Sequence, residues 1–130
     1  MLNSMTNLQY LFLNETAITD EGGPNVALCT NLEQVSLNDT AAGDVWMKHL
    51  AELKLLQSIY ASGTQVSDAG LTFLANSSSI RQLALNDTAV SNKGILSLNG
   101  IRLKSLNVQN TNVTGDAIKS ALPNCKYVIE

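Results

Sequence analysis

A 24-residue pattern recurs along almost the whole chain. Five segments align without gaps through eleven positions, and their first residues lie 24, 24, 24 and 23 positions apart. Each segment reads apolar-x-x-apolar-x-apolar-x-x-Thr-x-apolar, with only a few weak positions. The segments are LQYLFLNETAI (8–18), LEQVSLNDTAA (32–42), LQSIYASGTQV (56–66), IRQLALNDTAV (80–90) and LKSLNVQNTNV (103–113). A repeat of this length predicts a stack of similar units, each of which buries its apolar face against its neighbours.

The middle of each segment alternates with a period of two, which predicts a short β-strand. In the first segment Leu11 and Leu13 are expected to point toward the core, and Tyr10 and Phe12 away from it. A threonine follows each strand where the chain is expected to turn, and its hydroxyl is suited to bond backbone groups that a buried turn leaves without partners. The five threonines are Thr16, Thr40, Thr64, Thr88 and Thr111.

A short helix is predicted after each turn. Ser or Thr stands at its expected first position in four repeats, where these residues cap helices well. These residues are Thr19, Ser67, Ser91 and Thr114, with Gly43 in the second repeat. Carboxylates such as Asp68 follow in the first turn, where they favour the helix dipole. Apolar residues then recur three apart, as in Met47 and Leu50, and indicate one helical face turned to the core. Pro24, in a Gly-Gly-Pro run, is expected to disrupt the first helix.

One strand and one short helix per repeat predict an α/β fold, a right-handed solenoid with a parallel sheet on the concave side and short helices on the convex side. A single domain is expected over residues 1–130. Its repeats would span 8–31, 32–55, 56–79, 80–102 and 103–130, and residues 1–7 would be the tail of a preceding repeat.

Two stretches share a turn-and-helix signature, TQVSDAGL from Thr64 to Leu71 and TAITDEG from Thr16 to Gly22. Through them the chain resembles the leucine-rich-repeat family over about residues 2–130, and more narrowly its cysteine-containing subclass, in which Cys or Thr occupies the turn. The closing segment ALPNCK (121–126) resembles the end of many bacterial proteins built from this repeat. The resemblance implies a leucine-rich-repeat solenoid of the kind that usually binds other proteins. It does not identify the partner, because the scaffold serves many.

Charge is sparse and unevenly placed. Charged residues make up 15% of the chain and the net charge is −3, which argues against a nucleic-acid partner. Residues 1–47 hold six acids and no Lys or Arg, which gives −6, whereas residues 48–130 hold eight Lys or Arg and five acids, which gives +3. A solenoid spreads its sequence along an axis, so this difference predicts a dipole along the molecule. No apolar run approaches the ~20 residues of a membrane span, and no membrane partner is expected.

The residues capable of chemistry are few and scattered. Cys29 and Cys125 are each expected three residues before the start of a strand, as small buried side chains. About four repeats separate them, or ~19 Å at ~4.8 Å per strand, which is too far for a disulfide. His49, the only histidine, is expected on a solvated helix surface with Trp46 packed nearby, and no catalytic motif surrounds it. The chain is therefore predicted not to be an enzyme and to carry no cofactor or metal.

The outward side chains of the strands form the predicted binding site. They are almost free of charge, with aromatic rings among neutral amides and hydroxyls, a composition that suits a protein partner or a glycan. An ordinary exposed sheet face would have the same composition, so both interpretations stay open. The candidate binding residues are Tyr10, Phe12, Asn14, Ser36, Asn38, Tyr60, Asn86 and Asn107.

The N-terminal end suggests a second role. Leu2, Met5 and Leu8 are spaced like the tail of a preceding repeat, so the chain is expected to be the C-terminal part of a longer protein. An uncapped end of this kind would expose a strand edge and apolar side chains, which favours self-association. The alternative function is therefore a structural or accessory domain of a larger enzyme or receptor that docks through this end.

Overall fold

The computed structural model describes residues 6–130, and it repeats one unit of strand and short helix along its length. The strands are β1 (Tyr10–Phe12), β2 (Gln34–Ser36), β3 (Ser58–Tyr60), β4 (Gln82–Ala84), β5 (Ser105–Asn107) and β6 (Tyr127–Ile129). The helical elements are the 3-10 turn η1 (Asp20–Gly22), α2 (Gly23–Val26), α3 (Asp44–Leu50), α4 (Asp68–Leu74), α5 (Asn92–Leu96) and α6 (Gly115–Ala121). Leu2 and Met5, on which the predicted N-terminal repeat tail rests, lie outside the described residues.

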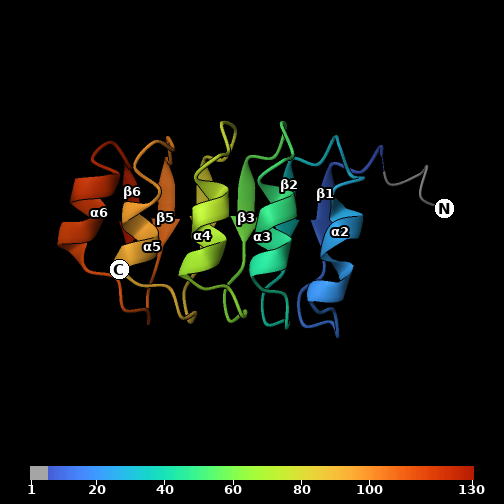
Figure 1. Ribbon diagram of the computed structural model, residues 1–130, viewed down its shortest axis with the longest axis horizontal. Helices are drawn as coiled ribbons and strands as arrows, with labels where there is room; N and C mark the ends of the chain where they lie inside the picture. The colour runs from blue at the N-terminus through green and yellow to red at the C-terminus, as the bar shows by residue number, and fades with distance from the viewer. Residues whose placement is uncertain (1–5) are drawn as a thin grey trace.

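The six strands form a single parallel sheet in sequence order, from β1 at one end to β6 at the other. The helices form a second row that covers one face of the sheet, in front of the strands in Figure 1. Each helix packs on the helix of the next unit, just as each strand pairs with the next strand. The predicted α/β class and the parallel sheet are confirmed, and the stack of units is solenoid-like.

Strand register confirms the predicted repeat and extends it. Tyr10 pairs with Gln34 and Gln34 with Ser58, so equivalent positions are 24 residues apart there. The spacing then falls to 23 between β4 and β5 and to 22 between β5 and β6. Val128 pairs with Leu106 in mid-strand, so its predicted place at the start of a strand was wrong. Cys125, 22 positions after Leu103, lies at the repeat position that was predicted for Val128.

The core lies between the sheet and the helices. One apolar side chain from the middle of each of the strands β1 to β5 points into it, and Val35, Ile59 and Leu83 are almost fully buried. The predicted helical pair of Met47 and Leu50 is fully buried as well. Each unit thus buries its apolar face against the units on both sides, which is the main stabilising contribution in a stack of repeats. Val128, in the middle of β6, is 37% exposed because no further unit within residues 6–130 covers it. No helix within residues 6–130 is long and apolar enough to cross a membrane.

The predicted role of the turn threonines is confirmed. Each hydroxyl donates to the backbone carbonyl three residues earlier; Thr64 Oγ1, for example, lies 2.6 Å from Ala61 O. The same bond forms in the other four turns, at 2.5–2.6 Å. The residue before each threonine has a positive φ, which glycine adopts without strain and Asn or Asp tolerate better than most residues. These residues are Glu15, Asp39, Gly63, Asp87 and Asn110.

The helix N-termini are held from the neighbouring unit. The carboxylate of Asp68 accepts from the backbone N–H and the hydroxyl of Ser91, at 2.7 and 2.5 Å. Asp44 binds Ser67 in the same way, at 2.8 and 2.5 Å. Ser67 and Ser91 lie at the predicted N-cap positions but make no side-chain cap within their own helices, so that part of the prediction was wrong. The hydroxyls turn instead toward the stronger, charged acceptor of the preceding unit.

The first helix is broken, as the Gly-Gly-Pro run predicted. A 3-10 turn, η1, leads into the four-residue α2, which has Pro24 in its first turn. Trp46 from α3 fills the adjacent space, and its indole N–H donates to Thr19 O at 2.8 Å. A Cβ on Gly22 would lie 3.3 Å from the Trp46 ring. The tryptophan, expected to pack on the helix, is 3% exposed and therefore part of the core.

Candidate functional site

The face of the sheet opposite the helices carries two outward side chains from each strand, and we call it the sheet face. The first column of the sheet face is Tyr10, Gln34, Ser58, Gln82, Ser105 and Tyr127. The second column is Phe12, Ser36, Tyr60, Ala84, Asn107 and Ile129. None of these side chains is charged. The order predicted from the repeat is confirmed through β5, and β6 adds a sixth row.

The two aromatic residues of β1 are the most accessible of the predicted anchors. Tyr10 is 56% exposed and Phe12 is 61% exposed. Tyr60 lies two strands away in the same column as Phe12, but it is only half-exposed. Its hydroxyl donates to Gln82 Oε1 at 3.0 Å. Tyr60 is therefore partly used in contacts within the sheet, whereas the rings of Tyr10 and Phe12 are accessible to a partner.

Ser36 does not offer the open surface that its outward position predicted. It is 4% exposed and donates from Oγ to Asn14 Oδ1 at 2.6 Å. Ser58, in the neighbouring column, is 7% exposed and donates to Gln82 Oε1 at 2.9 Å. Short side chains on a narrow parallel sheet are covered by the longer side chains of adjacent rows, which lie only ~4.8 Å away.

Three of the predicted asparagines, Asn14, Asn38 and Asn86, bond the ends of adjacent strands to one another, and the fourth, Asn107, bonds within its own unit. Asn14 Oδ1 accepts from the backbone N–H of Asn38 at 2.8 Å, and Asn38 Oδ1 accepts from that of Ser62 at 2.9 Å. Asn86 Oδ1 accepts from the hydroxyl of Ser62 at 2.5 Å. Asn107 Oδ1 accepts from the backbone N–H of Gln109 at 3.1 Å. The carbonyl ends of these amides thus stabilise the sheet, and only their remaining hydrogen-bonding capacity is free for a partner.

The last strand adds two apolar side chains that sequence reasoning missed. Tyr127 is 58% exposed and Ile129 is 50% exposed, in the columns of Tyr10 and Phe12. The predicted fifth repeat, 103–130, includes this segment as its tail, but the segment pairs as a strand at a spacing of 22 residues from β5, two fewer than the usual 24. The alternation of Tyr127, Val128 and Ile129 after Cys125 was the signal that a sixth strand begins there.

The other reactive groups lie apart from the sheet face. Both cysteines are free. Cys29 is fully buried, Cys125 is half-buried, and burial raises the pKa of both thiols. His49 lies on α3, half-buried rather than solvated as predicted, and its Nδ1 is buried with no hydrogen-bond partner. No group of three or more His, Cys, Asp or Glu residues within 6–130 is placed to hold a metal ion.

The sheet face thus combines an uncharged surface with exposed aromatic rings at its two ends, Tyr10 and Phe12 on β1 and Tyr127 on β6. Neither the protein-family models nor the curated proteins include a match to this chain.

Proposed function

We propose that this chain is a leucine-rich-repeat module that binds another protein through its sheet face and has no catalytic role. In this proposal the units wind as a right-handed solenoid, which makes the sheet face the concave side. The 24-residue repeat with Thr at every turn supports the family, and the parallel sheet with one short helix per strand is the architecture expected of it.

The observation that carries the proposal is the pair of exposed rings on β1. Tyr10 and Phe12 stand on an uncharged face, and both are more than half exposed. Tyrosine and other aromatic residues dominate the binding energy of protein interfaces, because a large rigid ring buries much apolar area at a small cost in entropy. The neutral Ser, Asn and Gln side chains around them match the polar rim of such interfaces. A glycan partner would use the same rings and amides, and is the alternative ligand for this face.

Site-specific photo-crosslinking would identify the partner and test the surface together. A photoreactive phenylalanine analogue would be placed at Phe12 on the sheet face and, as a matched control, at Phe73 on α4, which is 37% exposed on the opposite side. We expect a specific cross-linked protein from position 12 only. The affinity of that protein would then be measured for Y10A/F12A and for F73A. We expect at least tenfold weaker binding for the first variant, or ~1.4 kcal/mol, and no change for the second.

An equal cross-link from both positions, or equal affinity of both variants, would place recognition elsewhere. The alternative function, docking of β1 as the edge of a structural or accessory domain, makes a different prediction. Because β1 lies at one edge of the sheet, its backbone is open to another strand. The N–H of Leu13 bonds Ser36 O of β2, so the N–H of the preceding residue, Phe12, faces the open edge. In that case the interaction would survive Y10A/F12A and be lost in Y10A/F12P, which also removes this outward backbone donor.

A further inference from the structure

A column of basic residues lies at the edge of the sheet where the strands begin, which we call the strand-start edge. The residue before each strand bonds through its backbone to the same position of the previous unit. Lys104 N donates to Arg81 O at 2.7 Å, and Lys126 N donates to Lys104 O at 3.1 Å. Three cationic side chains thus stand in consecutive rows, ~4.8 Å apart at the backbone. The same column begins with Gln9, Glu33 and Gln57, so its charge changes sign along the molecule.

A hollow of about 670 Å³ opens beside these residues between the last two units. Its floor is apolar and comes from Ile101, Leu103 and Leu122, all of which are buried. The hollow lies where the repeat spacing falls from 24 to 23 and 22. In these last two units helix α5 has five residues against seven in α4, and the connection from α6 to β6 covers only residues 122–126. Gly100 lies on its wall, and a Cβ there would meet no atom within 4 Å.

The hollow continues along the strand-start edge. Two further hollows, of about 410 and 330 Å³, share Arg81 with it, and the second also shares Arg102. Together they hold five of the eight Lys and Arg residues of the chain. These five are Lys54, Arg81, Arg102, Lys104 and Lys126. Among the described residues, none that lines these hollows is acidic or aromatic. We call this continuous feature the basic groove.

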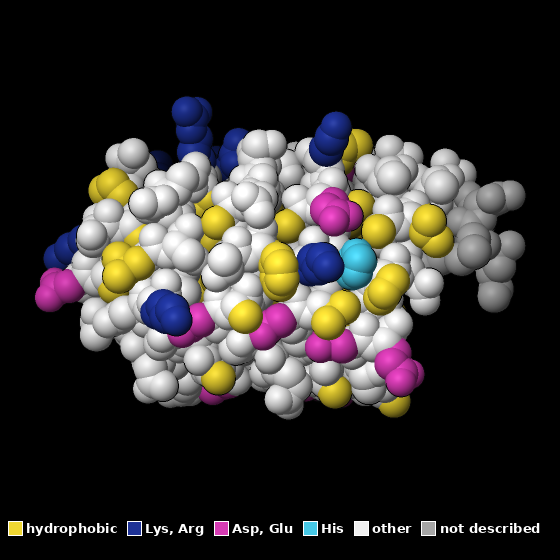
Figure 2. Space-filling model, viewed as in Figure 1, with side chains coloured by type: hydrophobic (Ala, Val, Ile, Leu, Met, Phe, Trp, Pro, Cys, Tyr) yellow, Lys and Arg dark blue, Asp and Glu magenta, His cyan; other side chains and the backbone are white. Residues whose placement is uncertain are grey.

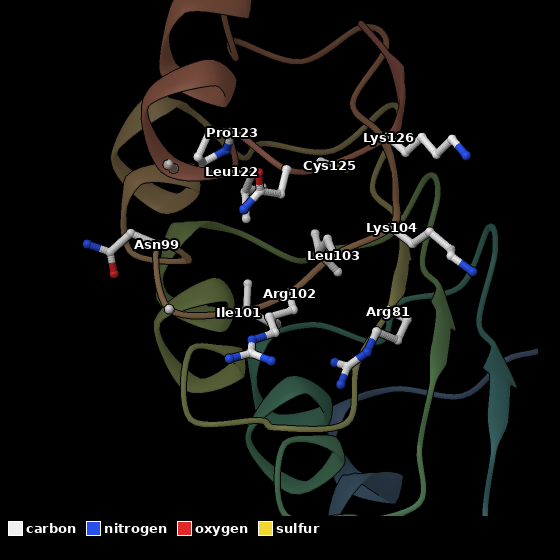
Figure 3. A pocket seen from close by; sticks show the side chains of 13 residues that line it. Arg81, Asn99, Ile101, Arg102, Leu103, Lys104, Leu122, Pro123, Cys125 and Lys126 are labelled. Carbon is white, nitrogen blue, oxygen red and sulfur yellow. The ribbon is translucent and has the colours of Figure 1, made fainter.

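The figures show how the groove is exposed. Basic side chains project from the upper edge of the molecule in Figure 2, whereas acidic side chains cross its lower half in a row. In Figure 3, Arg81 and Arg102 extend side by side below the hollow, and Lys104 and Lys126 extend outward on its other side. Leu103 lies between these two pairs, Ile101 lies beside Arg102, and Leu122 lies across the hollow beside Pro123. An apolar floor flanked by cations is therefore open to a ligand.

We propose that the basic groove binds an extended, acidic protein segment that inserts one apolar side chain into the hollow. Carboxylates would bond to the guanidinium and ammonium groups, with charge-assisted hydrogen bonds that are stronger than neutral ones. The distance from Gln57 to Lys126 is three strand spacings, or about 14 Å, which matches about four extended residues. The groove is separate from the sheet face, because Tyr10 and Phe12 do not line it. Loss of peptide binding to the basic groove would therefore leave the proposed function of the sheet face unaffected.

Nucleic acid fits the basic groove less well than an acidic peptide. Proteins that hold single strands stack bases on aromatic side chains, and no aromatic residue lines the described groove. The net charge of the chain is −3, and residues 1–47 alone have a net charge of −6. A long polyanion would therefore be repelled by the parts of the molecule outside the groove. A short acidic segment with an apolar residue avoids that repulsion and uses the floor of the hollow.

The test measures binding of a fluorescein-labelled peptide, Glu-Asp-Leu-Asp-Glu, by fluorescence polarisation at low salt. Two control peptides replace the acids by amides (Gln-Asn-Leu-Asn-Gln) or the leucine by glycine (Glu-Asp-Gly-Asp-Glu). The groove variant carries Gln at Arg102, Lys104 and Lys126, which are all exposed. The matched control variant carries Gln at Lys48, Lys93 and Lys119, which are exposed on α3, α5 and α6 and give the same net charge.

We expect the groove variant to lose at least about tenfold in affinity and the control variant less than about twofold. The variant G100W, which keeps every charge but fills the hollow, should weaken the leucine peptide about tenfold and the glycine peptide much less. Circular dichroism and Tm would show that each variant is folded. The proposal is overturned by equal losses in both triple variants, by equal binding of the amide peptide, or by no binding at about 1 mM protein. Tighter binding of a single-stranded oligonucleotide, lost in the groove variant alone, would reassign the groove to nucleic acid.

Discussion

The carboxylate of Asp68 accepts two hydrogen bonds from Ser91, one from its backbone N–H at 2.7 Å and one from its hydroxyl at 2.5 Å. The two residues are 23 positions apart and belong to successive units. Asp68 lies in the first turn of α4, and Ser91 is the N-cap of α5, so each helix start is held by the unit before it. Equivalent bonds join Asp20 to Gly43 and Asp44 to Ser67. The row of acids is therefore part of what couples one unit to the next.

Removing this carboxylate should destabilise the fold. We expect D68A to lower the free energy of unfolding by ~1.5–3 kcal/mol, since it leaves the part-buried N–H and hydroxyl of Ser91 without their charged acceptor. D116A is the matched control, because Asp116 is an exposed acid in the first turn of α6 and acts only on the helix dipole, an effect of ~0.3–1 kcal/mol. Urea denaturation would measure both. Equal losses would mean that the bond between units contributes nothing beyond the dipole.

Two helix glycines should resist replacement by alanine. A Cβ on Gly70 would lie 2.4 Å from Asp44 Oδ1, and a Cβ on Gly94 would lie 2.4 Å from Asp68 Oδ1. Alanine normally stabilises a helix by ~1 kcal/mol relative to glycine. We expect G70A and G94A to destabilise instead by ~1–3 kcal/mol, because the clash displaces the carboxylates. G100A, which meets no atom within 4 Å, should leave the denaturation midpoint within experimental error. A higher midpoint for G94A would contradict this account.

The turn threonines should differ in their contribution according to burial. Thr64 is 7% exposed and its hydroxyl bonds Ala61 O, so T64V should cost ~1–3 kcal/mol by leaving that carbonyl without its partner. Thr16 makes the equivalent bond to Leu13 O in an exposed turn, where water can replace it. T16V should therefore cost under ~0.5 kcal/mol. Thermal or urea unfolding of the two variants gives the comparison, and an unchanged midpoint for T64V would rule out a stabilising role for the buried hydroxyl.

The rings of the sheet face should divide into two kinds by their effect on stability. Y10A and F12A remove side chains that are 56% and 61% exposed, and each should change the free energy of unfolding by less than ~0.5 kcal/mol. Y60A removes a half-buried ring and its hydrogen bond to Gln82, so it should cost ~1 kcal/mol or more. Y60F isolates the hydroxyl. A large loss for F12A would show that this ring supports the fold and is not reserved for a partner.

The two thiols should react in a fixed order. Cys125 is half-buried at the hollow of the basic groove, whereas Cys29 is fully buried in the core. Burial raises the pKa of both thiols, so less thiolate forms at a given pH and both react more slowly than a free cysteine. Ellman's reagent at mildly alkaline pH should modify one thiol in the folded protein and the second only on unfolding. C125S should abolish the first phase, and persistence of that phase would contradict the burial of Cys29.

Much of the fold was predictable because the same pattern of apolar residues recurs five times in the sequence. The inward positions of Leu11 and Leu13, the outward positions of Tyr10 and Phe12 and the helical pair Met47 and Leu50 all follow from periodicity, which is local information. The turn threonines were predicted for the same reason, since each bonds a carbonyl only three residues away. The candidate anchors Tyr10 and Phe12 needed nothing beyond the alternation of the strand.

The sequence by itself thus determined the repeating unit, the parallel order of the strands and the uncharged character of the sheet face. Tertiary structure decided which of those side chains stay free. Ser36 is covered by Asn14 of the preceding unit, and the hydroxyl of Ser91 turns away from its own helix to Asp68. The tertiary structure also decided where the hollow of the basic groove opens, since its walls come from two stacked units whose spacing falls to 23 and 22 residues. These contacts join residues 22 or more positions apart, so their outcome depends on how neighbouring units fit together and not on the pattern within any one of them.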